Sequence, residues 1–175
     1  MRTLDQSSIV KSSTDRNLPV RPRRLRRSQA VRRLVRENRL AADMLVYPMF
    51  VVPGEGVDEP IESMPGQRHL SAELAVELAG SAFRAGVPAV LLFGAPRHKD
   101  DAATDAFADD GAVQQAIQGI KRSNPEIVVF SDVCVCAYTE HGHCGIVSSG
   151  EIDNDASLEV MATVALSHAR AGVDI

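Results

Sequence analysis

Residues 71–93, which read SAELAVELAGSAFRAGVPAVLLF, hold the pattern that decides the fold. The first part has apolar side chains at helical spacing, a serine that can cap the helix at its start, and Gly86 where the helix should end. The second part, residues 89–93, is a short apolar run of the kind that forms a buried strand. The stretch therefore predicts a helix followed by a strand. The helix side chains predicted to face inward are Leu74, Val76, Leu78, Ala79 and Phe83.

Apolar runs that predict strands recur along the chain. Residues 45–52 form one before the quoted stretch, residues 127–136 form another after it, and residues 173–175 begin a fourth. Between these runs lie helical patterns, and the last helix is capped by Asn154 or Asp155. The side chains predicted to face inward are Val113, Ile117 and Ile120 on the first of these helices and Leu158, Met161, Val164 and Leu166 on the last.

Strands and helices that alternate in this way form a parallel sheet with right-handed crossovers. Because the strand starts lie roughly 40 residues apart, four such units correspond to half of an eight-unit barrel of about 250 residues or more. A small doubly wound sheet is the alternative, but no Gly-x-Gly-x-x-Gly or Walker lysine loop follows the first strand. The predicted fold is α/β, a TIM (β/α)8 barrel, with residues 41–175 covering about its first half up to the fourth strand.

Charge is divided unevenly along the chain. Residues 1–40 hold 12 Lys/Arg and 3 Asp/Glu, a net charge of +9, whereas residues 41–175 hold 7 and 20, a net charge of −13, and the two sum to −4. The arginine cluster at 21–27 is also typical of nucleic-acid binding, but this stretch has no aromatic side chains for base stacking. The charge division favours a basic N-terminal arm, residues 1–40, that docks on an acidic neighbouring subunit, and no nucleic-acid partner. Within the arm, residues 28–40 predict a short amphipathic helix.

Composition indicates a globular protein that works away from membranes. Of the 175 residues, 45% are hydrophobic, but no stretch reaches the roughly 20 apolar residues that a membrane helix needs. The first ten residues have no apolar run of signal-peptide length. The three cysteines are an odd number crowded into one segment, which in a reducing compartment favours a metal or catalytic role over a disulfide. We therefore expect a cytoplasmic protein with no membrane partner.

The cysteines lie within residues 132–145, DVCVCAYTEHGHCG. If the third predicted strand continues through Cys136, its period of two places Asp132, Cys134 and Cys136 on one face, near the strand end where parallel barrels carry active sites. The loop that follows contains two glycines and can bring Cys144 to the other thiols. Three thiolates with no evident fourth protein ligand fit Zn²⁺ with an open coordination position, which can polarise a carbonyl or activate water.

Other interpretations of these residues stay open. The cysteines also fit small buried hydrophobic side chains, and a structural Cys3His site that uses His141 or His143 would close the open position. Asp132 fits a carboxylate that transfers protons or binds an ammonium group beside the metal, and equally a structural aspartate at a strand end. The two histidines also fit donors to the thiolates, ligands of a second metal, or exposed loop residues.

Residues 132–145 are similar to the metal-binding signature of the zinc-dependent porphobilinogen synthases, also called delta-aminolevulinic acid dehydratases. The resemblance covers about residues 20–175 and corresponds to the amino-terminal half of the family's chain. Further stretches that agree with the family are RPRRLRR at 21–27, YPMFV at 47–51, SMPG at 63–66, LFG at 92–94, KD at 99–100 and ND at 154–155.

This resemblance implies a TIM barrel whose N-terminal arm wraps a neighbouring subunit, usually within a homo-octamer. It implies that Cys134, Cys136 and Cys144 bind a catalytic zinc ion and that Asp132 is an active-site aspartate. His143 matches a position that, in some members of the family, contributes to a second zinc site with a cysteine from later in the chain. The implied reaction is that of a hydro-lyase of tetrapyrrole and heme biosynthesis. It condenses two molecules of delta-aminolevulinate to porphobilinogen with loss of water.

The chain departs from the family in its lysines. The family mechanism uses two lysines that form Schiff bases with the two substrates, and both belong to the second half of the barrel. This chain has only Lys11, Lys99 and Lys121, and none of them matches. We therefore expect the isolated chain to be inactive. The alternatives are a non-catalytic zinc-binding or assembly fragment of the same fold and a zinc-containing nucleic-acid binder.

Overall fold

The chain has two compact units, Met1–Arg39 and Leu40–Ile175, and the computed structural model describes residues 23–175. The first 22 residues of the predicted basic arm lie outside the described residues. The described part of the first unit contains a 3-10 helix, η2 (Arg24–Arg26), and a six-residue helix, α1 (Gln29–Leu34). Ser28 caps α1 by accepting the backbone N–H of Val31. The helix is shorter than the 28–40 segment predicted, and backbone hydrogen bonds alone stabilise so short a helix only weakly.

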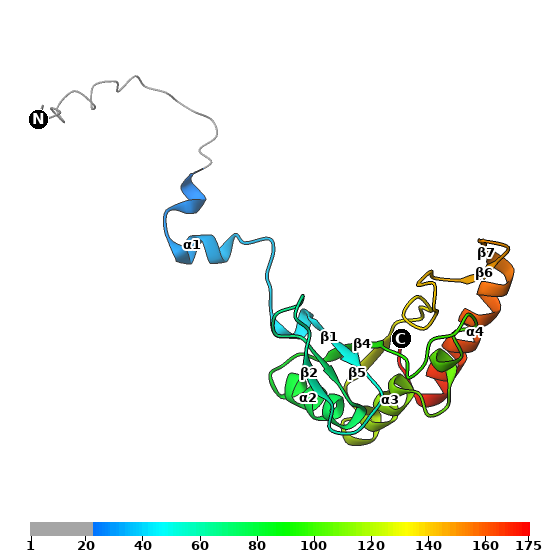
Figure 1. The fold of residues 1–175 in the computed structure, drawn as a ribbon. Coiled ribbons are helices and arrows are strands. Elements are labelled where there is room, and N and C mark those ends of the chain that lie inside the picture. The colour runs from blue at the N-terminus through cyan, green and yellow to red at the C-terminus, as the bar shows by residue number, and fades with distance from the viewer. Residues whose placement is uncertain (1–22) are drawn as a thin grey trace, which may run out of the picture. The chain divides into compact units, whose positions relative to one another are not determined.

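The second unit is built on a five-stranded sheet with the order β2-β3-β1-β4-β5 (Figure 1). Three neighbouring strands of this sheet run parallel to one another: β1 (Val46–Val51), β4 (Ala89–Gly94) and β5 (Val128–Ser131). Helix α2 (Ala72–Arg84) precedes β4, and helix α3 (Ala112–Ser123) precedes β5. The short 3-10 turn η3 (Ala42–Met44) comes before β1, and η4 (Thr104–Phe107) comes before α3. This alternation confirms the predicted parallel α/β architecture.

A short hairpin extends the sheet beyond β1. It consists of β2 (Asp58–Pro60) and β3 (Arg68–Leu70), which pair antiparallel, and β3 runs parallel to the end of β1. Arg68 forms an ion pair with Asp58 across the hairpin. Three-residue strands carry too little hydrophobic pattern to be recognised in a sequence, and neither strand was predicted.

The last three residues, predicted to begin a fourth strand, form backbone hydrogen bonds to β5 but are not themselves a strand of the structure. The backbone N–H of Asp174 donates to the carbonyl of Val129 at 3.0 Å, and the N–H of Ser131 donates to the carbonyl of Ile175 at 3.0 Å. The Asp174 carboxylate accepts the Val129 N–H at 2.8 Å and the Lys121 ammonium at 2.9 Å. These bonds lay the end of the chain alongside β5.

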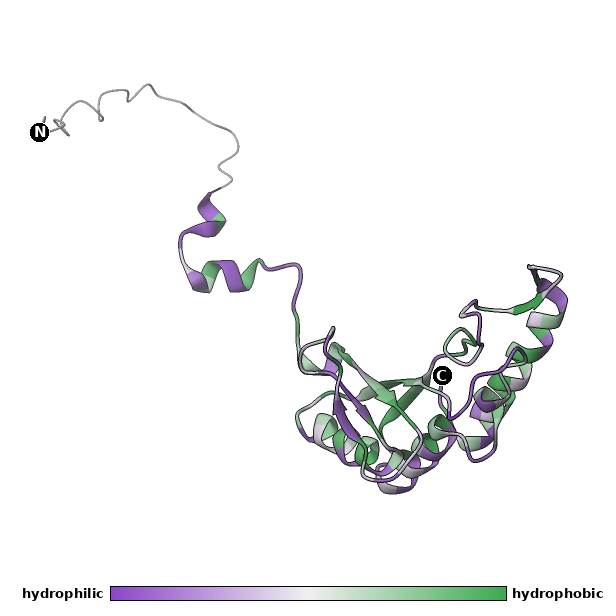
Figure 2. Ribbon diagram, in the orientation of Figure 1, coloured by the Kyte–Doolittle hydropathy of each residue, from purple (hydrophilic) through white to green (hydrophobic). Residues whose placement is uncertain are grey.

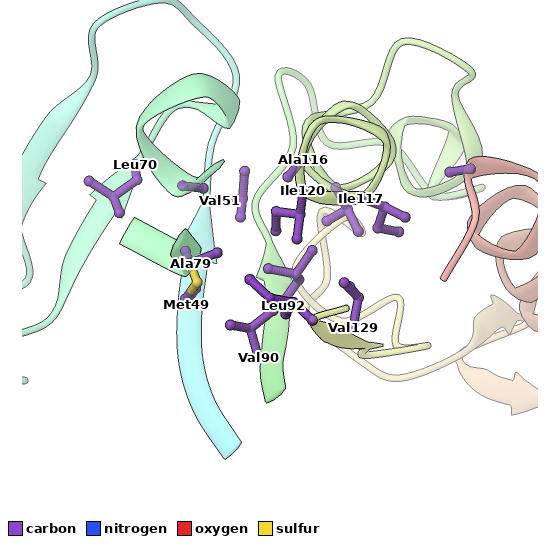
Figure 3. Close-up of a cluster of buried hydrophobic side chains, with 14 residues drawn as sticks. Met49, Val51, Leu70, Ala79, Val90, Leu92, Ala116, Ile117, Ile120 and Val129 are labelled. Carbon is purple, nitrogen blue, oxygen red and sulfur yellow. The ribbon is translucent and has the colours of Figure 1, made fainter. Parts of the chain in front are cut away.

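The core lies between the sheet and helices α2 and α3 (Figure 3). Val113, Ile117 and Ile120 of α3 are buried, as predicted. On α2 the fully buried positions are Ala75, Ala79 and Gly80, and the larger predicted side chains pack half-buried around them. The central strands are predominantly hydrophobic (Figure 2). Buried side chains of this size contribute about 1.5–3 kcal/mol each, so this layer fixes the sheet and its ends.

The other face of the sheet is also apolar. The rings of Phe50 and Phe93 stack on it with centroids 5.4 Å apart, and both side chains are half-buried. Strands that are apolar on both faces are typical of parallel sheets with both faces covered.

The chain after β5 forms a loop, the hairpin of β6 (Ile146–Ser148) and β7 (Glu151–Asp153), and the long helix α4 (Asn154–Ala171). The Asp153 carboxylate caps α4 by accepting the N–H of Ala156, and Gly172 ends it with a φ of 101°. Of the predicted inward residues Val164 is buried, but Leu158 and Leu166 are 58% and 51% exposed. That prediction was wrong because α4 carries apolar residues on both sides, so their spacing does not select a face.

Of the helices within residues 23–175, none combines the length and the apolar content needed to cross a bilayer.

Candidate metal centre

The first two cysteines lie just beyond β5, on either side of Val135, where a turn begins, and the strand predicted to run through Cys136 ends at Ser131. The strand period is therefore not what brings Cys134 and Cys136 together. Instead, the backbone N–H groups of Tyr138 and Thr139 donate to the carbonyl of Val135 at 2.9 and 3.0 Å and close a turn around it.

Val135 anchors this turn in a small hydrophobic cluster. Its side chain is 1% exposed. The buried residues of the cluster are Ala103, Ala106, Val135, Tyr138 and Val164. Since one cysteine precedes Val135 and the other follows it, burying this one side chain leaves both thiols on the open side of the turn.

The three thiols meet at one point. Cys134 Sγ lies 3.3 Å from Cys136 Sγ and 3.3 Å from Cys144 Sγ, and all three sulfurs lie within 4.8 Å of one another. A tetrahedral zinc ion with Zn–S bonds of about 2.3 Å holds its sulfurs about 3.8 Å apart, so this spacing fits. Within residues 23–175 this is the only group of three or more potential metal ligands. Cys134 and Cys136 are half-buried and Cys144 is exposed.

The pKa values of Cys134 and Cys136 are shifted in opposite directions. Burial acts to raise the pKa of Cys134, but hydrogen bonds from the backbone and thiol of Cys136 and from the thiol of Cys144 lower this pKa below its ordinary value. The hydrogen bond to Cys134, together with burial, raises the pKa of Cys136 to about 12. Protons held between sulfurs in this way are the ones that a bound cation replaces, since thiolates are the metal-binding form.

Cys144 comes to the other thiols on a tight loop. Gly142 adopts a φ of 73°, which glycine accepts without steric cost. The backbone N–H of His143 donates to Nδ1 of His141 at 3.1 Å, and the two imidazole rings stack with centroids 5.4 Å apart. The hydroxyl of Thr139 donates to the carbonyl of His143 at 3.2 Å. These contacts fold the segment before Cys144 back toward β5.

Neither histidine joins the sulfur cluster. No ring nitrogen of His141 or His143 lies within 4.8 Å of all three sulfurs. Because Nδ1 of His141 accepts a hydrogen bond, its Nε2 carries the proton, and this buried nitrogen has no partner among the described residues. The predicted alternative of a Cys3His site is thus not assembled here, and His143 is exposed.

Asp132 lies at the end of β5, exposed and beside the thiols. Its backbone N–H still donates to the carbonyl of Leu92 at 3.1 Å, which fixes its position at the sheet edge. Burial raises the pKa of Tyr138 to about 12, and the negative charges of Asp105 and then Asp132 add to this rise. Asp132 is therefore near enough to the turn for its charge to be felt there.

The loop after β4 supports the same turn from the other side. The backbone N–H of Asp100 donates to the carbonyl of Tyr138 at 3.2 Å. The Asp105 carboxylate accepts the backbone N–H groups of Arg97 and His98 at 2.6 and 2.9 Å and so holds this loop in shape. Sequence reasoning missed these supporting residues, because loop carboxylates that bind backbone groups have no spacing signature.

The chain matches the family described as "Delta-aminolevulinic acid dehydratase" over residues 19–175. It is 44% identical over 155 residues to the delta-aminolevulinic acid dehydratase of Ruminiclostridium josui, a match that covers 89% of this chain and 76% of that one. It is 46% identical over 155 residues to the delta-aminolevulinic acid dehydratase of Bacillus subtilis, with 89% and 48% covered.

A solved structure agrees with these sequence matches. The crystal structure of delta-aminolevulinic acid dehydratase (porphobilinogen synthase) from Toxoplasma gondii, in complex with the reaction product porphobilinogen, matches with a TM-score of 0.84 and 37% identity. The match covers 90% of this chain and 46% of that one. The chain thus spans about half the length of the Toxoplasma structure and of the Bacillus relative. It belongs to the delta-aminolevulinic acid dehydratase family.

Proposed function

We propose that this chain supplies the metal-binding half of a porphobilinogen synthase, which condenses two molecules of delta-aminolevulinate to porphobilinogen with loss of water. The observation that carries this proposal is the cluster of three thiols at the end of β5, in a chain that belongs to this family. The proposed substrate is delta-aminolevulinate, and the proposed pathway is tetrapyrrole and heme biosynthesis.

Zinc is the metal that this donor set favours. Three thiolates are soft ligands, and the sulfur spacing fits a tetrahedral ion whose fourth position is open. Bound there, zinc would polarise a substrate carbonyl as a Lewis acid. Cys134, Cys136 and Cys144 would hold it at the edge of the sheet, and Asp132, a few residues away, would hold a proton or bind the ammonium group of a substrate. His143, exposed beside the cluster, is the candidate ligand for a second zinc ion.

The complete fold that we propose is a TIM (β/α)8 barrel. Its support is the parallel order of β1, β4 and β5, the apolar second face of the sheet around Phe50 and Phe93, and the backbone bonds that lay Asp174 alongside β5. Closing the sheet would cover that second face.

The lysines of this chain are not placed for Schiff-base chemistry. Nζ of Lys121 is bound to the Asp174 carboxylate and to the carbonyls of Pro125 and Ile127. Lys99 is exposed in the loop after β4, and Lys11 lies outside the described residues. A nucleophilic lysine must bring a free amine to the substrate ketone, whereas Nζ of Lys121 is engaged by three other groups. We therefore propose that turnover requires lysines from a further part of the barrel.

The charge division supports a homo-oligomer, an octamer by resemblance to the family. Residues 1–40 carry +9 (12 minus 3) and would dock on the acidic remainder, at −13 (7 minus 20), of a neighbouring copy. The proposed compartment is the cytoplasm, since three reduced thiols need a reducing environment.

A chimera tests the proposed reaction. The carboxyl-terminal half of the Bacillus subtilis relative, fused after Ile175, should complete the site and produce porphobilinogen from delta-aminolevulinate. Cys134→Ala in the same chimera should remove both zinc and turnover. A folded chimera that binds zinc and forms no product would refute the proposed function.

A further inference from the structure

Two buried hydroxyl groups hold the chain on either side of Cys144. Before it, the hydroxyl of Thr139, a fully buried residue, donates to the carbonyl of His143 at 3.2 Å. After it, the hydroxyl of Ser157, which is 6% exposed, accepts the backbone N–H of Ile146 at 2.8 Å. Cys144 is the exposed member of the three thiols, so its place depends on these neighbours more than on its own burial.

Ser157 both donates and accepts a hydrogen bond at this point. It lies in the first turn of α4, and its hydroxyl donates to the carbonyl of Asp153 at 2.5 Å while accepting from Ile146. The hydroxyl proton is therefore directed into the helix, which leaves an oxygen lone pair aimed at the loop. An alanine here would leave the Ile146 N–H without its partner.

Gly145 allows the loop to come this close to α4. A Cβ atom at position 145 would lie 2.7 Å from Ser157 Oγ and 2.8 Å from Ile152 Cγ2, closer than non-bonded carbon atoms approach. Gly145 is itself buried. Because it has no side chain, Gly145 can pack directly against Ser157.

Helix α4 also holds the other two thiols. Val164, on the same helix as Ser157, packs in the hydrophobic cluster that buries Val135, the residue between Cys134 and Cys136. One helix is therefore linked to both parts of the thiol site: Val164 belongs to the hydrophobic cluster that buries Val135, and Ser157 bonds the loop that carries Cys144.

We propose that Ser157 is a positioning residue of the metal centre: through the N–H of Ile146 it fixes Cys144 at the distance from Cys134 and Cys136 that a single metal ion needs. This inference rests on the proposed metal site. Outer partners of this kind, when removed, typically lower metal affinity 10- to 100-fold. We expect a loss in that range for Ser157→Ala, because the free loop must then be ordered when the metal binds.

The test measures Zn²⁺ affinity of the reduced 175-residue chain by competition with a chromophoric chelator, and the Co²⁺ spectrum of the same variants. Ser157→Ala and Gly145→Ala should both weaken zinc binding, and Ser157→Ala should lose part of the thiolate-to-cobalt absorption as Cys144 leaves the metal. Ser157→Thr keeps the hydroxyl and should restore affinity. Ser167→Ala is the matched control, since Ser167 is also buried on α4 and hydrogen-bonded, but to Gln114 and Val164 and not to the loop that carries Cys144.

The possible outcomes distinguish a failure of the positioning role of Ser157 from a failure of the proposed metal site. Wild-type affinity in Ser157→Ala, or an equal loss in Ser167→Ala, would overturn the positioning role while leaving the metal site intact. A wild-type chain that binds no metal through its thiols would overturn the proposed site and this inference together. Unfolding curves for each variant show whether it is folded, and Gly145→Ala tests the same contact if Ser157→Ala fails to fold.

Discussion

Val135 is the residue whose truncation best separates stability from metal binding. Val135→Ala removes two methyl groups from a side chain that is 1% exposed, which costs about 1.6 kcal/mol at about 0.8 kcal/mol per buried carbon. Two of its neighbours, Ala103 and Ala106, are too small to fill the space, so a cavity remains and the total reaches about 2–3 kcal/mol. Because Cys134 and Cys136 flank this side chain, the thiol spacing should loosen as well.

The control is Val129→Ala, which removes the same two methyl groups from a fully buried valine in the main core. Urea denaturation of the metal-free chain should give similar losses of unfolding free energy for both variants. Zinc competition should then show weaker binding in Val135→Ala alone, by about tenfold, as expected when support around metal ligands is lost. Equal zinc affinity in the two variants would refute the argument that Val135 sets the turn that carries two ligands.

Cys134→Ala and Cys144→Ala should each abolish tight zinc binding and thiolate-to-cobalt absorption; unchanged metal content would mean that the ligands are assigned wrongly. Burial lowers the pKa of His168 below its ordinary value of about 6.5, so the unfolded chain takes up a proton that the folded chain resists. Stability should be full above pH ~6.5 and fall as the pH drops below it, and His168→Gln should flatten that slope in urea titrations run at several pH values. Deleting residues 1–40 should shift sedimentation toward smaller assemblies without loss of zinc, whereas unchanged sizes would exclude the arm from assembly. Borohydride trapping with labelled delta-aminolevulinate should leave the isolated chain unlabelled, and a stable adduct would show that one of its own lysines forms a Schiff base.

The predictions that the structure confirmed rest on sequence patterns that fit only one local structure. Val113, Ile117 and Ile120 share one face of a helix whose other side is polar, so the sequence allows only one orientation. The apolar run at 89–93 is long enough to cross the sheet and too short for a helix, and it forms β4. Both features are local, and a local pattern was enough to place them.

The predictions that failed depend on contacts distant in the sequence. Leu158 and Leu166 are exposed because α4 is apolar on both sides, and only its partners decide which side is buried. The strand at 127–136 ends at Ser131, since beyond it the chain turns to bury Val135 against α4. The thiols were expected to meet through strand periodicity, whereas they meet through a turn and a loop that are each held by tertiary packing.

The cysteine segment, residues 132–145, depends on the helix that follows it. A peptide of residues 132–145 contains all three thiols, yet it lacks Val164, which buries the turn, and Ser157, which holds the loop. Its backbone would have to be ordered by the metal alone, at about 1–2 kcal/mol per residue fixed. In the folded chain, packing against α4 has already ordered this backbone before a metal binds. The proposed metal site is therefore formed by the loop and the helix together: the cysteines supply the ligands, and the segment that follows them holds those ligands in place.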